Sequence, residues 1–159
     1  FMPYGEAQKA TVRIRVPNGT EVYDFSASRK VRGDWKDGWL TVTTELPSAG
    51  GRLFCLYPAA CKRLTVACPD NLRRGQAAVV EITLCDPKGK PIPGRQLVDL
   101  DVVDPRGRPH DEAGFYRMED GVARVSVRVA LNDEAGNWMI RARERATGLS
   151  ASLKFKVRR

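Results

Sequence analysis

Apolar residues recur at every second position through most of this chain, and this pattern constrains the fold more than any other feature of the sequence. It is clearest between residues 76 and 105, in two alternating runs: Ala78, Val80, Ile82 and Leu84, then Val98, Leu100 and Val102. Such alternation is typical of strands with one buried face, because successive side chains point to opposite faces. Asp86-Pro87-Lys88-Gly89 separates the runs and Asp104-Pro105-Arg106-Gly107 follows them, and both have the composition of a type I turn.

The second part of the chain, residues 62–159, contains seven such runs with turns every eight to twelve residues. Besides the two runs above, the predicted strands are 63–67, 114–118, 122–131, 137–145 and 151–157. Asp120-Gly121 marks a hairpin tip between two of them. This pattern predicts an all-β fold, a seven-stranded immunoglobulin-like antiparallel sandwich.

Residues 1–61 predict a smaller β-sheet unit of about five short strands, at 9–16, 20–25, 28–32, 39–44 and 52–57. Asn18-Gly19 predicts a hairpin between the first two strands, and residues 33–38 have the composition of a loop. A unit of this size is only marginally stable alone. We therefore expect it to be incomplete by itself and to pack on the second unit or on sequence before Phe1. Because Phe1 is not a natural translation start, we expect the chain to be part of a longer protein.

The net charge of +8, from 27 Lys and Arg against 19 Asp and Glu, raises the question of polyanion binding. The basic residues are scattered over nearly every predicted strand and lack a nucleic-acid-binding signature, so nucleic acid is not expected as a partner. In the sandwich, outward Asp99 and Asp101 are expected beside Arg141 and Arg143, with Lys154 and Lys156 beyond. A solvated, partly paired sheet face is the preferred interpretation, and a polyanion-binding face stays open. No apolar run approaches the ~20 residues of a membrane helix, so membrane insertion is not expected.

The four cysteines, Cys55, Cys61, Cys68 and Cys85, lie in the middle third of the chain. They form no C-x-x-C pair, and His110 is the only histidine, so neither a zinc site nor another metal or cofactor is predicted. If the strands that contain Cys61 and Cys85 form a hairpin, a disulfide between them is geometrically feasible. Free, half-buried thiols are the preferred alternative.

Trp35 and Trp39, separated by Lys36-Asp37-Gly38, are the best candidates for ligand contact. Two indoles near a loop tip can stack on sugar rings, with Tyr23 or Tyr57 assisting, as in a carbohydrate-binding module. The alternative, which we prefer, is that they pack in a small core or between the units.

The acidic residues predict no catalytic site. Their adjacent or near-adjacent pairs all lie in turn-like stretches, where acids are expected for conformational reasons: Asp34 and Asp37, Asp111 and Glu112, Glu119 and Asp120, Asp133 and Glu134. His110 has no serine or cysteine nucleophile motif to activate. We expect no enzyme activity. A fragment of an active site remains a weaker alternative, and it requires acids from different loops to converge.

Several turn motifs carry a family resemblance. Gly75, residues 86–94, residues 102–107 and Gly136-Asn137-Trp138 make the second unit resemble bacterial immunoglobulin-like modules related to macroglobulin domains. Residues 21–58 look like the small β modules near the C-terminus of large secreted bacterial proteins similar to glycoside hydrolases of the β-galactosidase type. The resemblance implies a non-catalytic accessory region, used for spacing, packing or docking against other domains of a parent chain in an extracellular or periplasmic location. The catalytic carboxylates of such enzymes lie in a barrel that this chain does not contain.

Overall fold

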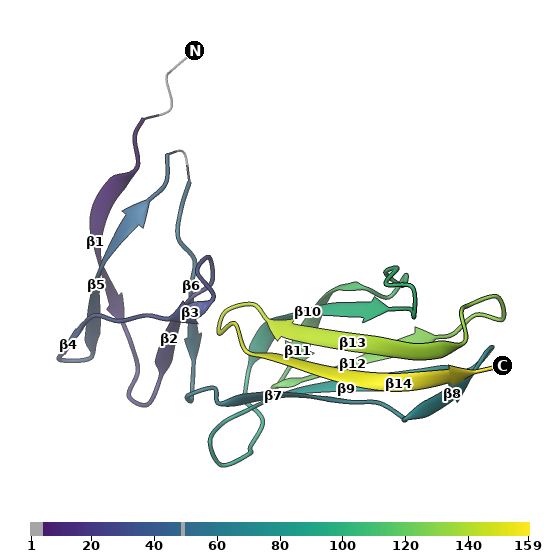
Figure 1. The fold of residues 1–159 in the computed structure, drawn as a ribbon. Helices are drawn as coiled ribbons and strands as arrows, with labels where there is room; N and C mark the ends of the chain where they lie inside the picture. The colour runs from purple at the N-terminus through teal and green to yellow at the C-terminus, as the bar shows by residue number, and fades with distance from the viewer. Residues whose placement is uncertain (1–4, 49) are drawn as a thin grey trace.

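A computed structural model describes residues 5–48 and 50–159, and its fold is all-β (Figure 1). The predicted all-β class is confirmed, and the arrangement of the sheets is that of a β-sandwich. The strands are β1 (Gln8–Arg15), β2 (Glu21–Asp24), β3 (Arg29–Lys30), β4 (Asp34–Lys36), β5 (Trp39–Leu46), β6 (Phe54–Tyr57), β7 (Arg63–Ala67), β8 (Asn71–Arg73), β9 (Ala77–Cys85), β10 (Arg95–Val103), β11 (Gly114–Glu119), β12 (Val122–Arg128), β13 (Gly136–Glu144) and β14 (Ser150–Arg158). Within the described part of the chain, no helix is long and apolar enough to cross a membrane.

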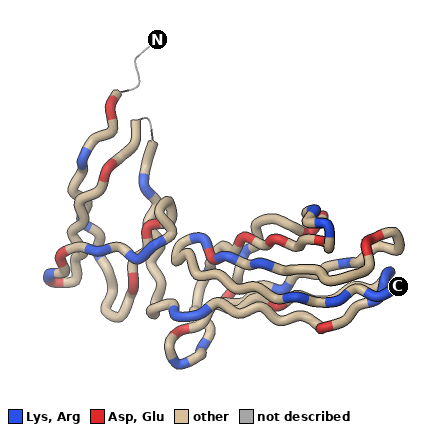
Figure 2. Tube along the Cα trace, in the orientation of Figure 1, with Lys and Arg blue, Asp and Glu red and all other residues tan. Residues whose placement is uncertain are grey.

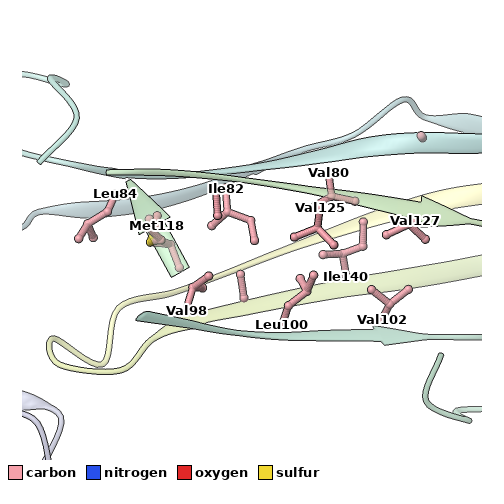
Figure 3. Packing of buried hydrophobic residues seen from close by; sticks show 14 of the residues in the cluster. Val80, Ile82, Leu84, Val98, Leu100, Val102, Met118, Val125, Val127 and Ile140 are labelled. Carbon is pink, nitrogen blue, oxygen red and sulfur yellow. The ribbon is translucent and has the colours of Figure 1, made fainter. Parts of the chain in front are cut away.

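The second unit is one sheet, called sheet C here, with the order β7-β9-β12-β11-β10-β13-β14-β8. Its two halves are joined only at the β11–β12 hairpin, through the pair Glu119 and Val122. The sheet therefore folds over into two layers, and side chains from both layers meet between them (Figure 3). Val80 and Ile82 on one layer face Leu100 and Ile140 on the other, and all four are fully buried. All seven predicted strands are present, together with the short strand β8, which pairs in parallel with β14.

The exposed face of β10 and β13 has the predicted neighbours. Asp99 lies opposite Arg143, and Asp101 lies opposite Arg141. None of these four residues forms an ion pair within the described chain, so they neutralise one another by proximity alone. Figure 2 shows acidic and basic residues distributed over both units.

The first unit consists of two three-stranded sheets, sheet A with the order β1-β5-β4 and sheet B with the order β3-β2-β6. They enclose a small apolar cluster: Val16, Val22, Val31, Leu40 and Val42. The hairpin predicted at Asn18-Gly19 is wrong, because β1 pairs along its whole length with β5 and not with β2. Pro17 has no N–H for a continued ladder, and its carbonyl accepts a hydrogen bond from the Thr20 N–H at 3.1 Å. The resulting turn leads the chain from sheet A to sheet B.

The loop predicted at residues 33–38 is also wrong, because it contains β4 and the tip of a hairpin with β5. Asp37 and Gly38 both have positive φ, 51° and 77°. A type I′ turn needs this conformation at both central residues, and Asp-Gly is a preferred sequence for it. The Asp-Gly signal for a hairpin was therefore present in the sequence. The short polar strand β4 before it, however, shows no clear alternation of apolar and polar residues.

Candidate functional site

The two tryptophans proposed for sugar contact lie on opposite faces of sheet A. Trp35 is opposite Leu40 in the β4–β5 ladder, on the side of the small core, and its side chain is 52% exposed at the edge of that core. Trp39 is opposite Arg15 and therefore points to the outer face. The guanidinium of Arg13 lies 5.0 Å from the centre of the Trp39 ring. The two indoles consequently do not form one stacking platform.

Tyr23 and Tyr57 are not near the tryptophans but lie between the two units. Each is only 5% exposed, and their ring centres are 5.3 Å apart. Both belong to sheet B, where successive side chains along a strand point to opposite faces of the sheet. Val22 packs in the small core, whereas Tyr23 and Tyr57 pack against the core of the second unit. The four residues proposed as a ligand site are thus divided between two places.

A buried carboxylate, Glu144, lies at this junction. Its side chain is fully buried at the end of β13. It accepts hydrogen bonds from the Tyr57 hydroxyl at 2.9 Å, from the Ala146 N–H at 3.1 Å and from the Thr147 N–H and hydroxyl at 2.6 and 2.5 Å. Burying a charged group is costly unless it is hydrogen-bonded. Three of these donors belong to the loop after β13, and the fourth, Tyr57, is supplied by β6 of the first unit.

Further contacts between the units surround Glu144. The Ser28 hydroxyl donates a hydrogen bond to the Arg145 carbonyl at 2.8 Å. The Arg145 guanidinium lies 5.9 Å from the ring centres of both Phe25 and Phe115. Gly148 has φ of +75°, and a Cβ there would lie 2.7 Å from the Ser28 carbonyl oxygen. The loop between β13 and β14 therefore fits closely against the first unit.

The junction shifts the ionisation of the groups within it. Burial raises the pKa of the Tyr57 phenol, and the Glu144 carboxylate beside it raises it further. Burial likewise raises the pKa of Tyr23, whose oxygen accepts a hydrogen bond from the Cys61 N–H at 3.1 Å. Burial raises the pKa of the Cys61 thiol to about 12. These groups stay protonated at neutral pH, which favours packing and hydrogen bonding over nucleophilic chemistry.

All four cysteines are free in the structure. The predicted pairing of β7 with β9 is present, but its register places Arg63 opposite Cys85. Cys61 lies two residues before this pair, next to the tyrosines of the junction. The proposed disulfide between Cys61 and Cys85 is therefore not formed here. No cluster of His, Cys, Asp or Glu suited to a metal ion occurs in the described ranges.

One group of acids from different loops does converge, around His110. Its Nδ1 contacts the Glu112 carboxylate, its Nε2 lies 3.6 Å from Asp133, and its ring meets that of Trp138 edge-on at 5.3 Å. Both acids also accept hydrogen bonds from backbone N–H groups at or just after the end of β12. The described residues that line this hollow include no Ser, Thr or Cys. The arrangement thus holds the loop after β10 against the loop after β12, and it lacks a nucleophile of its own.

The sequence did not reveal the His110 cluster, because its acids looked like separate turn residues. Only the topology brings the loop after β10 and the loop after β12 to the same end of the sandwich. Glu144, in contrast, had a usable signal. It continues the inward alternation of Trp138, Ile140 and Ala142 by one further step.

The comparisons with known proteins give no family assignment. No family model matches the chain, and no curated protein matches it. Among solved structures, a superoxide reductase (neelaredoxin) from Ignicoccus hospitalis aligns with 14% identity over 62% of this chain and 82% of that chain, with a TM-score of 0.44. A glycosyl hydrolase family 2 member from Bacteroides cellulosilyticus aligns with 16% identity over 100% of this chain and 24% of that chain, with a TM-score of 0.47.

A β-glucuronidase from glycoside hydrolase family 2 aligns with 16% identity over 98% of this chain and 19% of that chain, with a TM-score of 0.49. The chain thus spans a quarter or less of the two hydrolase chains. Alignments with such low identity and TM-scores below 0.5 do not establish a shared function.

Proposed function

We propose that the chain is a non-catalytic accessory region of a larger exported bacterial protein of the glycoside-hydrolase type, in which its two β units act as one rigid spacing or docking piece. The observation that carries this proposal is the junction at Glu144. Its fully buried carboxylate is hydrogen-bonded by Tyr57 of the first unit and by its own loop. Separating the units would leave this charge without one of its donors. A connection of this kind holds two units at a fixed angle.

The parent protein and the exported location are parts of the proposal that rest on the sequence resemblance. The other domains of that parent chain are the proposed partners. In cells that produce the full-length protein, immunoblots of separated fractions should place it outside the cytoplasm. Finding it in the cytoplasmic fraction would remove the exported location from the proposal.

Rigidity is tested by residual dipolar couplings measured on the whole chain. We expect the amides of sheet B and sheet C to fit a single alignment tensor, because the junction fixes their relative orientation. Tyr57→Phe, which removes the hydroxyl bonded to Glu144, should lower the agreement with a single tensor. Two different tensors in the unmodified protein would contradict a rigid spacer.

The non-catalytic role needs a separate measurement. With a panel of aryl glycosides, the chain should not release the phenol faster than buffer alone does. If it does, Glu112→Gln and Asp133→Asn decide whether the His110 cluster is responsible. Turnover that these substitutions abolish would replace the accessory role with an enzymatic one.

Carbohydrate binding is the second candidate function, and the exposure of Trp35 favours it. An indole that is 52% exposed at a sheet edge can stack on a sugar ring. Titration of tryptophan fluorescence with neutral oligosaccharides should then give a saturable change that Trp35→Phe abolishes and Trp39→Phe does not. A titration without any change would exclude this candidate for the sugars used.

A further inference from the structure

A cleft of about 760 Å³ opens between the two sheets of the first unit. The residues that line it belong to β2, β3, β5 and β6 and to the segment that follows β3. Figure 1 shows that this segment leads the chain from β3 in sheet B to β4 in sheet A. Part of its lining is apolar, from Val31, Val42 and Phe54, and part is basic, from Arg29, Lys30 and Arg32. Ligand sites typically occupy roughly 300 to 1,000 Å³. The cleft is therefore large enough for a short peptide or a few sugar rings.

The strand β5 borders this cleft with its edge and not with one face. Three consecutive residues, 42–44, line the cleft, although consecutive side chains of a strand point to opposite faces. On this side, β5 is paired only from Trp39 to Thr41, by the short strand β4. Within the described chain, the second half of β5 therefore has no strand partner on the cleft side.

The backbone groups that face this edge can be identified from the hairpin. Its two-residue turn directs the N–H and C=O of Trp39 toward β4, and those of Thr43 and Glu45 point the same way because the orientation repeats every second residue. The carbonyl of Glu45 accepts a hydrogen bond from Arg52 Nε at 3.0 Å, which agrees with this direction. The N–H and C=O of Thr43 and the N–H of Glu45 are left without a strand partner in the described residues.

The charge beside this edge is positive. Lys30 is paired with Glu21, whereas Arg29 and Arg32 form no ion pair within the described ranges. The acid in the lining, Asp24, is already bound by an arginine of the neighbouring loop. Two guanidinium groups are thus available to an anionic ligand.

We propose that this cleft binds an extended acidic peptide of another polypeptide, which adds as a strand to the free edge of β5. The peptide backbone would bond to Thr43 and Glu45, its acidic side chains would pair with Arg29 and Arg32, and its alternate apolar side chains would contact the apolar lining. An anionic sugar could also pair with arginine, but it cannot continue a β ladder. The free edge therefore favours a peptide. This inference does not depend on the accessory role proposed above.

The test uses the whole ¹⁵N-labelled chain and a blocked peptide of about six residues in which Asp and Val alternate. Saturable shifts of the Thr43 and Glu45 amide resonances are expected. Replacing both Arg29→Glu and Arg32→Glu should weaken binding roughly tenfold or more, because attraction becomes repulsion. Thr43→Pro should abolish it, since this substitution removes an N–H that faces the cleft and bonds to no other strand.

The matched control is Lys154→Glu with Lys156→Glu on the exposed face of β14, which changes the net charge equally and should leave the affinity unchanged. A peptide with Lys in place of Asp should not bind. If Thr43→Pro does not fold, the affinity of the variant with Arg29→Glu and Arg32→Glu decides whether the peptide binds in this cleft. The proposal is overturned if the Asp-Val peptide leaves the Thr43 and Glu45 amides unshifted, if a folded Thr43→Pro variant binds it normally, or if oligogalacturonate shifts the same amides with equal or higher affinity.

Discussion

Individual residues determine how the two units are joined, and the junction depends on protonated groups. Glu144 is ionisable and fully buried, and its nearest partner from the first unit is a phenol that must keep its proton to donate a hydrogen bond. The pKa values of Tyr57, Tyr23 and Cys61 are all raised by burial. A residue with this behaviour couples the stability of the junction to pH.

Stability should therefore fall on the alkaline side of neutrality. A group whose pKa is higher in the folded protein than in the unfolded chain stabilises the fold fully below its unfolded pKa, and this contribution is lost as the pH rises through the folded pKa. For Cys61 the window runs from 9.0 to about 12, and for Tyr57 it begins at 10.0. Urea unfolding at about pH 7.5 and about pH 10.5 should show the lower free energy of unfolding at the higher pH.

The substitution Tyr57→Phe separates the contribution of Tyr57 to the pH dependence of stability from that of Cys61. At neutral pH it should cost about 1 to 3 kcal/mol, because a buried carboxylate loses a donor. It should also make the alkaline decline shallower, since one of the shifted groups has been removed. An unchanged slope between the two pH values would show that Tyr57 is not coupled to folding in this way.

At the scale of elements, the same turn occurs twice at the ends of sheet C strands. Asp86 Oδ1 accepts the N–H groups of Lys88 and Lys90, each at 2.8 Å. Asp104 repeats this pattern with the backbone N–H groups two and four residues later. In each loop the fourth residue is a glycine with positive φ, and its N–H bonds to the Asp carbonyl. The side chain of the aspartate thus organises the loop.

Asp86→Ala should destabilise the protein by about 1 kcal/mol, the usual cost of losing a side chain that caps backbone N–H groups. Asp86→Asn should cost less, because its side-chain carbonyl can accept the same two bonds. Thermal unfolding of both variants beside the unmodified protein checks this order. Equal losses for the two substitutions would point to charge as the cause, and not to the hydrogen bonds.

Elements with strong local signals were predictable, and those fixed by distant contacts were not. Asp120-Gly121 forms the expected hairpin tip, with positive φ at both residues. Asn18-Gly19 carries the same kind of signal, yet β1 finds its partner in β5 because an eight-residue ladder is available there. The strand β8 has only three residues and exists through its parallel contact with β14. Local composition contains no information about that contact.

The candidate site shows the same limit. The sequence identified Trp35, Trp39, Tyr23 and Tyr57 as aromatic residues with a role in packing or binding, but it could not show which face each side chain takes once the sheets form. Burial of the tyrosines follows from the docking of sheet B on the second unit, a contact between residues far apart in the chain.

At the scale of the whole molecule, the first unit depends on the second because sheet B is covered on both faces. One face meets the small core of sheet A, and the other meets the core of sheet C through Tyr23 and Tyr57. Sheet C has an extensive core of its own, which draws on both of its layers. For the predicted division into residues 1–61 and 62–159, we therefore expect the two units to differ in stability. The second unit should fold alone, and the first should not.

Expressing the two fragments separately tests this prediction. Residues 62–159 should give a dispersed amide spectrum and a cooperative unfolding transition, because their core lies mostly within the fragment. Residues 1–61 should give amide resonances with the narrow dispersion typical of an unfolded chain. Without sheet C, two large aromatic side chains are exposed, and the remaining unit is near the lower size limit for independent folding. Adding the second fragment to the first should not restore the junction fully, because association then costs translational entropy that the intact chain avoids. A well-dispersed spectrum for residues 1–61 alone would show that the small core is sufficient, and the contacts at Glu144 would then join two units that are each stable by themselves.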